Sequence, residues 1–308
     1  MLLSFSIVSL SGCAFFGSTT YRPNPLTVLP DRVHLRNVPF HAQAALQCGP
    51  AALAMALGYS GRDVQPEMLA QQVYTPGRKG SLQSAVIGAT RRNARLAYPI
   101  QGLDCLLAAL AAGRPVIVLQ NLGLSWIPRW HYAVAVGYDL NEQQIILHTG
   151  DMRDRRVGLA IFTRTWRRAD QWGLQVLVPG EMPACSEESA YLQAALGLQQ
   201  AGQTDAALAA FSAGAEHWPG SSAAQMAFGN ALYAGGDFSG AIRAFEQAGQ
   251  RAPADGAAFN NLAHVLAETG ALEAAESAAQ HAVDLGGPHH AIYRQTLEEI
   301  RQRRQGRQ

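Results

Sequence analysis

A period of 34 residues runs through the C-terminal part of the chain and constrains its fold more than any other feature. From about residue 187 onward, residues of one type return at that spacing: Gly202, Gly236 and Gly270; Ala207, Ala241 and Ala275; Phe211 and Phe245; Pro219 and Pro253. The period indicates stacked units of two helices. Glycine suits the turn between the helices, alanine lets them cross closely, and the aromatic residue fills the groove against the next unit.

This pattern resembles tetratricopeptide repeats and implies an all-α solenoid. We expect three repeats over residues 187–290, at about 188–221, 222–255 and 256–289, followed by a capping helix and basic tail over 291–308. The third repeat is looser, with Ala279 in the aromatic position and Gly287 in the proline position. Stacked repeats present a concave surface that suits a peptide or a partner protein. The alternative is that the repeats only enlarge and stabilise the rest of the chain.

A second feature lies near the N-terminus, where Cys48 precedes Gly49 and Pro50 at the start of the apolar run AALAMAL. Proline suits the first helical position, so the sulfur lies at or next to the N-cap, where free N–H groups and the helix dipole favour an anion. His131 begins the strand-like run HYAVAVGYD. An imidazolium beside a thiol lowers the thiol pKa, so the two residues predict an ion pair that is reactive near neutral pH. The alternative is a small buried cysteine that packs the helix start.

Four stretches in this order resemble the papain-like cysteine peptidases that remove double-glycine leaders from bacteriocin precursors: VPFHAQAALQCGPAALAM, KGSLQSAVIGATRRNARLAYPI, LLAALAAGRPVIVLQ and WHYAVAVGYD. The resemblance implies a papain-like domain over 38–184, with helices first and antiparallel strands later. The predicted fold class is therefore an α+β papain-like cysteine peptidase domain followed by an all-α tetratricopeptide-repeat solenoid.

The resemblance also implies roles for individual residues. Cys48 matches the family nucleophile and His131 its base. Gln43 matches the glutamine whose side-chain amide, with the backbone N–H of Cys48, stabilises the tetrahedral oxyanion. In the family this glutamine usually lies six residues before the cysteine, whereas Gln43 lies five before it.

The third member of the predicted site is open. The family carries an aspartate followed by proline at the end of the strand after the histidine, and here that strand reads IILHTGD. His148 holds the approximate aligned position and Asp151 lies three residues further. A second histidine would orient His131 less strongly than a carboxylate, and Asp151 reaches His131 only if the strand end bends. A dyad without a third member is the remaining alternative.

The N-terminal segment of residues 1–13 is apolar and ends in Leu-Ser-Gly-Cys, which resembles a bacterial lipoprotein signal that ends at an acylated Cys13. The residue after it is Ala14 rather than aspartate, which by resemblance favours the outer membrane, with the protein facing the periplasm. Residues 14–37, rich in serine, threonine and proline, are expected to form an extended tether. The alternative is a buried N-terminal helix or strand.

Composition and absent motifs exclude several function classes. The formal net charge of +1 gives no reason to expect nucleic-acid binding, and no glycine-rich loop for ATP phosphates is present. The chain has no cysteine and histidine spacing typical of a metal site, so we expect neither metal nor cofactor. Cys105 and Cys185 remain. An oxidising compartment permits a disulfide between them, but the apolar context DCLLAAL favours core packing for Cys105.

The sequence thus predicts a cysteine peptidase, anchored by lipid on Cys13, that cleaves a peptide or protein with help from the repeats. Two alternatives stay open. The same thioester intermediate would serve an acyltransferase, and a degenerate peptidase domain with repeats would serve as a non-catalytic scaffold. The presence of Cys48, His131 and Gln43 favours the enzyme, and the missing Asp-Pro favours the scaffold.

Overall fold

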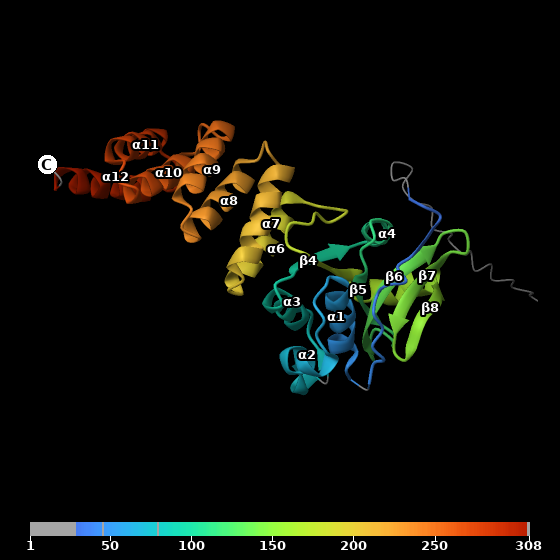
Figure 1. The fold of residues 1–308 in the computed structure, drawn as a ribbon. Coiled ribbons are helices and arrows are strands. Elements are labelled where there is room, and N and C mark those ends of the chain that lie inside the picture. The colour runs from blue at the N-terminus through green and yellow to red at the C-terminus, as the bar shows by residue number, and fades with distance from the viewer. Residues whose placement is uncertain (1–28, 45, 79, 307–308) are drawn as a thin grey trace, which may run out of the picture.

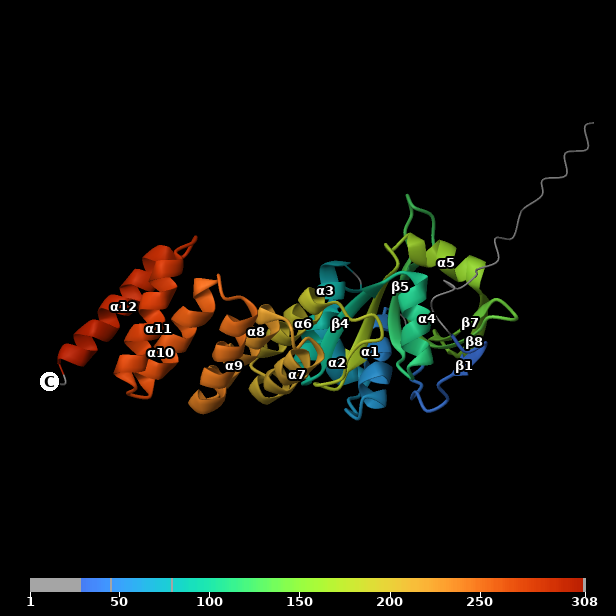
Figure 2. The same cartoon turned by 90° about the horizontal axis from the view of Figure 1, so that it is seen from above.

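The computed structural model describes residues 29–44, 46–78 and 80–306 (Figure 1). The predicted signal, the lipidation site Cys13 and most of the predicted tether therefore lie outside the described residues. A sheet-rich domain comes first and an elongated array of helices follows it (Figures 1 and 2). The predicted fold class, an α+β domain followed by an all-α repeat region, is confirmed.

The first domain is built on a seven-stranded sheet in which every neighbouring pair is antiparallel. Its order is β4 (Leu96–Gln101), β9 (Trp172–Leu177), β5 (Val116–Asn121), β6 (Trp130–Asp139), β7 (Gln144–Thr149) and β8 (Met152–Gly158), with β1 (Arg32–His34) paired to the end of β6. A separate ribbon consists of β2 (Tyr74–Thr75) and β3 (Gly80–Ser81), joined by the short helix η1 (Pro76–Arg78).

Helices cover both faces of this sheet because the central strands are apolar on both sides. On β6, Val134 and Val136 pack into one core and Ala133 and Ala135 into the other, as the two-residue period of a strand requires. The first core contains α1 (Cys48–Tyr59), α2 (Pro66–Val73) and α3 (Gln83–Arg92). The second contains α4 (Leu103–Ala111) and α5 (Leu159–Arg167).

Helix α1 is the most enclosed helix of the sheet domain. Residues 49–57 are all buried, and their alanine, leucine and methionine side chains leave no polar face, which is typical of a helix surrounded by protein. Because α1 packs against β6, the first residue of the helix, Cys48, lies beside the start of that strand.

The helical region consists of three helix pairs and a last helix. The pairs are α6 (Glu188–Gln200) with α7 (Thr204–His217), α8 (Ser222–Ala234) with α9 (Phe238–Arg251), and α10 (Gly256–Glu268) with α11 (Leu272–Leu285); α12 (His290–Gln305) follows. The turns within the pairs contain Gly202, Gly236 and Gly270, whose φ angles are 74°, 81° and 84°. Glycine recurs there because side chains with a Cβ rarely adopt this left-handed conformation. Among the described helices, none is long and apolar enough to cross a membrane.

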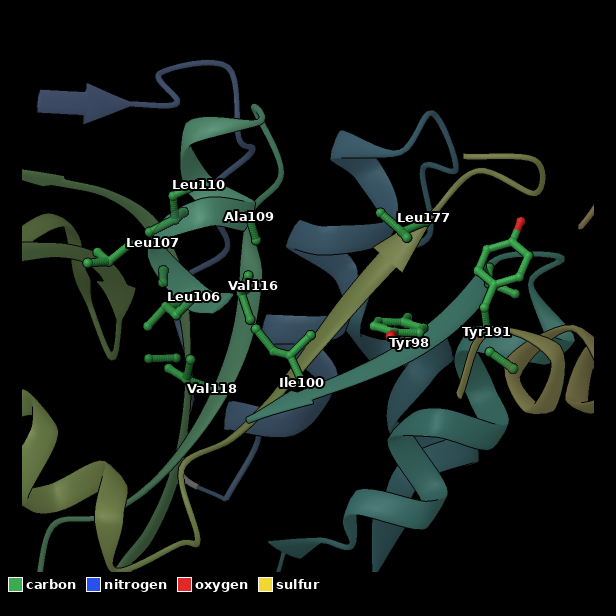
Figure 3. Close-up of a cluster of buried hydrophobic side chains, with 14 of the residues drawn as sticks. Tyr98, Ile100, Leu106, Leu107, Ala109, Leu110, Val116, Val118, Leu177 and Tyr191 are labelled. Atoms are coloured by element: carbon green, nitrogen blue, oxygen red, sulfur yellow. The ribbon is translucent and has the colours of Figure 1, made fainter. Parts of the chain in front are cut away.

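The first repeat shares a core with the sheet domain. Tyr191 of α6 is fully buried in the same cluster as Ile100 of β4 and Val118 of β5 (Figure 3). The hydroxyl of Tyr98 donates to the carbonyl of Cys185 at 3.1 Å and accepts the N–H of Glu187 at 3.1 Å. The two regions are therefore joined by a continuous apolar interior rather than by a free linker.

A disulfide between Cys105 and Cys185 closes this junction, with the two Cα atoms 5.7 Å apart. The expectation that Cys105 only packs the core was wrong. The fold of β4 and the segment before α6 brings Cys185, 80 residues away in sequence, against the start of α4. That approach arises from tertiary structure and leaves no local signal in the sequence.

We expect Cys185→Ser to lower the free energy of unfolding by about 2 to 4 kcal/mol, because a cross-link over a long segment restricts the unfolded chain. Urea denaturation followed by circular dichroism measures this change. Cys48→Ser is the matched control, since Cys48 is a free thiol and its loss leaves the cross-link intact. Equal midpoints for wild type and Cys185→Ser under oxidising conditions would contradict a stabilising bridge.

Candidate active site

An open pocket of about 840 Å³ lies at the N-terminus of α1 and brings together residues that are far apart in sequence. Three of the predicted site residues, Gln43, Cys48 and His131, line it. The other lining residues are Ala44, Leu46, Gly80, Ser81, Leu82, Gln83, Leu119, Pro128, Arg129, Trp130, Tyr132, Gly150, Ala169 and Asp170. The pocket is thus formed by the segment before α1, the ribbon strand β3 and the start of β6.

Cys48 is a half-buried free thiol beside the backbone of Tyr132, the residue after His131. Burial raises the pKa of the thiol above the ordinary value of 9.0, and hydrogen bonding from the backbones of Tyr132, Gly49 and Cys48 offsets this only in part. Gly49 allows a close approach, because a Cβ there would lie 2.4 Å from the Ser81 hydroxyl oxygen.

His131 is held by a hydroxyl group. Its Nε2 atom shares a hydrogen bond of 2.7 Å with Oγ1 of Thr149, and its Nδ1 atom has no hydrogen-bond partner among the described contacts. Burial, and secondly the charge of Arg155, lower the pKa of His131 below the ordinary 6.5. The pKa shifts of thiol and imidazole are therefore opposite to those of the predicted ion pair. Desolvation favours an uncharged thiol and an uncharged imidazole in the resting pocket.

Neither candidate for the third member lies against His131. His148 is buried on the other face of β7, where its Nε2 lies 3.3 Å from the carbonyl oxygen of Val38 and its Nδ1 accepts the N–H of Asp154 at 3.2 Å. Asp151 lies in the turn before β8 with an exposed side chain and does not line the pocket. Thr149 holds the position instead.

Strand alternation explains why Thr149 was missed and how it could have been found. Successive residues of a strand point to opposite faces, so a partner for His131 must share its face. His148 pairs with Val134 in the register of β6 and β7, which places it on the α1 face. Thr149, one residue later, lies on the face of His131. The motif comparison aligned His148 with the family aspartate, whereas the residue that contacts His131 is Thr149, one position later.

Gln43 is fixed at both ends of its side chain. Its Oε1 accepts the N–H of Gly150 at 2.9 Å and its Nε2 donates to the carbonyl of Tyr132 at 3.1 Å. Its backbone N–H also donates to Gly150, at 2.8 Å. An amide nitrogen carries two hydrogens, so one remains among the described contacts for an oxyanion in the pocket. The amide is thus oriented before a ligand binds.

Ser81 is a further polar group that sequence reasoning did not single out. Its hydroxyl oxygen is buried at the pocket wall and has no hydrogen-bond partner among the described residues. The carbonyl of Ser81 accepts the Tyr132 hydroxyl at 3.2 Å, which holds β3 over the start of β6. A buried hydroxyl without a partner is costly and is available to a bound substrate. Within the described residues, no group of three histidine, cysteine or acidic side chains could hold a metal ion.

The sheet domain is similar to known proteins. Residues 35–171 match the family model described as "Peptidase_C39 like family". A solved structure described as a C39-like peptidase from Bacillus anthracis is 19% identical, covers 48% of this chain and 98% of its own, and gives a TM-score of 0.41. No curated protein sequence matches the chain.

The helical region is similar to solved repeat proteins. The type III secretion chaperone SycD of Yersinia enterocolitica, in complex with a peptide of the translocator YopD, is 20% identical, covers 39% of this chain and 97% of its own, and has a TM-score of 0.36. The first tetratricopeptide repeat domain of Spaghetti, bound to an HSP90 peptide, is 16% identical, covers 37% of this chain and 90% of its own, and has a TM-score of 0.35. The three helix pairs, each with a glycine of positive φ in its turn, fit tetratricopeptide repeats.

We expect Thr149→Asp to raise the pKa of His131, because a carboxylate stabilises the imidazolium where a hydroxyl does not. The imidazolium in turn favours the thiolate of Cys48. Alkylation of Cys48 by iodoacetamide at pH 7, followed by peptide mass spectrometry, should therefore become about threefold faster for each unit by which the thiol pKa falls. The thiolate fraction rises about tenfold per unit, and the lower nucleophilicity of a less basic thiolate offsets part of that gain. In the wild type, alkylation should accelerate only in the alkaline range. Thr149→Asn is the matched uncharged control, and equal rates for Asp and Asn would contradict this account of the site.

Proposed function

Because residues 35–171 form a domain of the Peptidase_C39-like family, we propose that this protein is a cysteine peptidase that cleaves a peptide or protein substrate. One observation carries the proposal. A thiol at a helix N-terminus, an imidazole held through Nε2 by Thr149 and an oriented glutamine amide line the same open pocket. These are the nucleophile, base and oxyanion donor that acyl transfer requires.

The proposed reaction starts from an uncharged pair. As the sulfur of Cys48 attacks the scissile carbonyl carbon, Nδ1 of His131 takes the thiol proton. The oxyanion is stabilised by the Nε2 group of Gln43 and the backbone N–H of Cys48. The C–N bond then breaks, His131 returns the proton to the leaving amine, and water hydrolyses the thioester.

The pH dependence follows from the direction of the His131 shift. The imidazole must be uncharged to accept the proton, so activity is present above its pKa and lost as the pH falls through it. Since burial lowers that pKa below 6.5, the acid limb of kcat/KM lies at a lower pH than an ordinary histidine would give.

A non-catalytic scaffold is the second candidate. The observations that favour it are the raised pKa of Cys48 and the uncharged Thr149 where the related peptidases have a carboxylate. An acyltransferase would use the same thioester with an amine in place of water. The pocket is open enough for either acceptor, and the products of the reaction distinguish them.

We further propose that acylated Cys13 anchors the protein at the periplasmic side of the outer membrane. The disulfide between Cys105 and Cys185 supports an oxidising compartment. The resemblance of the first 13 residues to a lipoprotein signal supports the anchor.

The repeats are proposed to bind a protein partner or an extended part of the substrate. Helices α8 and α10 carry side chains that continue from one helix to the next. Nδ2 of Asn261 donates to Oδ1 of Asn230 at 3.2 Å, and the rings of Tyr233 and His264 lie 5.9 Å apart. Amides and aromatic rings in a row suit a peptide backbone and its side chains. We place the partner on this surface.

We expect Cys48→Ala to abolish proteolysis and Gln43→Glu to lower kcat about a hundredfold, as loss of one oxyanion donor does. Gln43→Glu keeps an acceptor for the N–H of Gly150 while removing the amide donor. Native substrates are first identified as new protein N-termini that disappear in cells carrying Cys48→Ala. Hydrolysis of peptides spanning those sites is then measured. Wild-type and Cys48→Ala cells with identical N-termini would favour the scaffold.

We expect the double variant Asn230→Ala and Asn261→Ala to leave short-peptide hydrolysis unchanged and to slow processing of the native protein substrate. Short peptides reach only the pocket, whereas the longer substrate also reaches α8 and α10. Rates on both substrates are compared by mass spectrometry. The matched control is Gln295→Ala, an exposed amide residue of α12. Equal slowing on both substrates would assign the repeats a structural role.

A further inference from the structure

The loop between β5 and β6, residues 122–129, exposes an unusual number of large apolar side chains. Leu122, Leu124, Trp126 and Ile127 are 52%, 51%, 74% and 53% exposed, and Trp130, the first residue of β6, is 55% exposed. Single exposed apolar residues are common on soluble proteins, but five within nine consecutive positions mark an interaction surface. We refer to these five side chains as the apolar tip.

The loop is built to hold this conformation without help from the apolar tip. Asn121 is 2% exposed, and its Oδ1 accepts the N–H groups of Gly123 at 3.0 Å and Arg129 at 2.9 Å. The N–H of Leu122 donates to the carbonyl of Arg129 at 2.9 Å. A Cβ at Gly123 would lie 2.3 Å from the carbonyl oxygen of Ile127. A buried asparagine and a required glycine thus fold the loop so that the apolar side chains face outward.

Arginine residues lie next to the apolar tip, in the loop and at the end of α5. Arg168, at the end of α5, donates from Nη1 to the carbonyl of Gly123 and so joins the helix to the loop. Ile161, which is 54% exposed, shares a helix face with Arg164 and Arg168 by its spacing. Arg129 belongs to the loop itself, Arg167 is the last residue of α5, and Asp170 is the acidic residue nearest to Arg167 in sequence. This local excess of arginine contrasts with a whole-chain charge of only +1.

We propose that the apolar tip and the adjoining face of α5 dock on an anionic lipid bilayer. The loop projects from the molecule beside α5 (Figure 2), a shape that suits insertion rather than enclosure of a partner. Tryptophan, leucine and isoleucine at the tip would enter the boundary between headgroups and acyl chains, and the arginines behind them would meet lipid phosphates. This docking depends neither on acylation of Cys13 nor on the chemistry of Cys48.

Docking would place the pocket at the bilayer. Arg129 and Trp130 belong both to the docking surface and to the pocket lining, together with Pro128. A loop inserted at its tip therefore brings the pocket mouth to the headgroup region. The substrates that fit this arrangement are polypeptide segments at or emerging from a membrane surface.

The test measures the fluorescence emission of Trp126 in the presence of lipid vesicles. Full-length protein with Cys13→Ser, which removes any acyl chain, is mixed with vesicles of phosphatidylcholine alone or of equal parts phosphatidylcholine and phosphatidylglycerol. The emission of Trp126 is taken as the difference between this protein and the same protein with Trp126→Phe. We expect a blue shift with the anionic vesicles, and quenching when the acyl chains are brominated. Because the signal comes from Trp126, attachment through residues 1–20 does not imitate it.

Two sets of variants sharpen the result. Leu124→Ser with Ile127→Ser should abolish the shift and weaken vesicle partitioning at least about tenfold, as loss of buried apolar side chains predicts. Ile292→Ser on α12 is the matched control, since Ile292 is 54% exposed, and it should change nothing. Arg164→Gln with Arg167→Gln should reduce binding to vesicles that contain phosphatidylglycerol and should not change the signal with phosphatidylcholine vesicles. Unquenched Trp126 on anionic vesicles would overturn the proposal, and so would equal quenching with and without phosphatidylglycerol.

Discussion

The packing of α1 against β6 is the contact on which the rest of the site depends. The helix is surrounded by apolar side chains over residues 49–57, so its position is fixed by a core rather than by polar contacts. Its first residue, Cys48, is thereby set against the backbone of Tyr132, and the peptide of Tyr132 connects directly to His131. The carbonyl of Tyr132 also accepts a hydrogen bond from Nε2 of Gln43 and so orients that side chain. Cys48, His131 and Gln43 thus all depend on the start of β6, and a shift of α1 along the strand would separate Cys48 from the other two.

Desolvation gives this site its electrostatic character. The enclosed helix start that positions the thiol also raises its pKa, and burial lowers the pKa of the imidazole. A carboxylate beside His131 would oppose that shift, but Thr149 supplies a hydroxyl without charge. In the proposed reaction, the thiol and imidazole therefore become charged only when the sulfur attacks a substrate carbonyl next to the Gln43 amide. Such a site has low background reactivity toward small electrophiles, which suits a peptidase that acts on a selected partner.

The sheet domain and the helical region are joined by a shared core and a disulfide. Tyr191 of α6 is buried with residues of β4 and β5, and the disulfide from Cys105 to Cys185 closes the junction. The repeat surface therefore has a fixed direction relative to the pocket. The loop before β6 has the same property, since Asn121 and Arg168 tie it to the sheet and to α5. In the proposed arrangement, the repeats bind a protein partner and the loop docks on a bilayer, and both surfaces have a fixed position relative to the same pocket.

The sequence by itself determined the elements whose signals are local. The 34-residue period predicted the paired helices because glycine with positive φ must recur in each turn, and the apolar run after Cys48 predicted a buried helix. Strand β8 and helix α5 were not predicted, since β8 is a polar edge strand without apolar alternation. Only the tertiary structure decided that Thr149, and not His148 or Asp151, contacts His131, and that Cys105 meets Cys185. Those choices depend on strand register and on the approach of distant segments, which are set by packing of the whole core and leave no trace in the neighbouring residues.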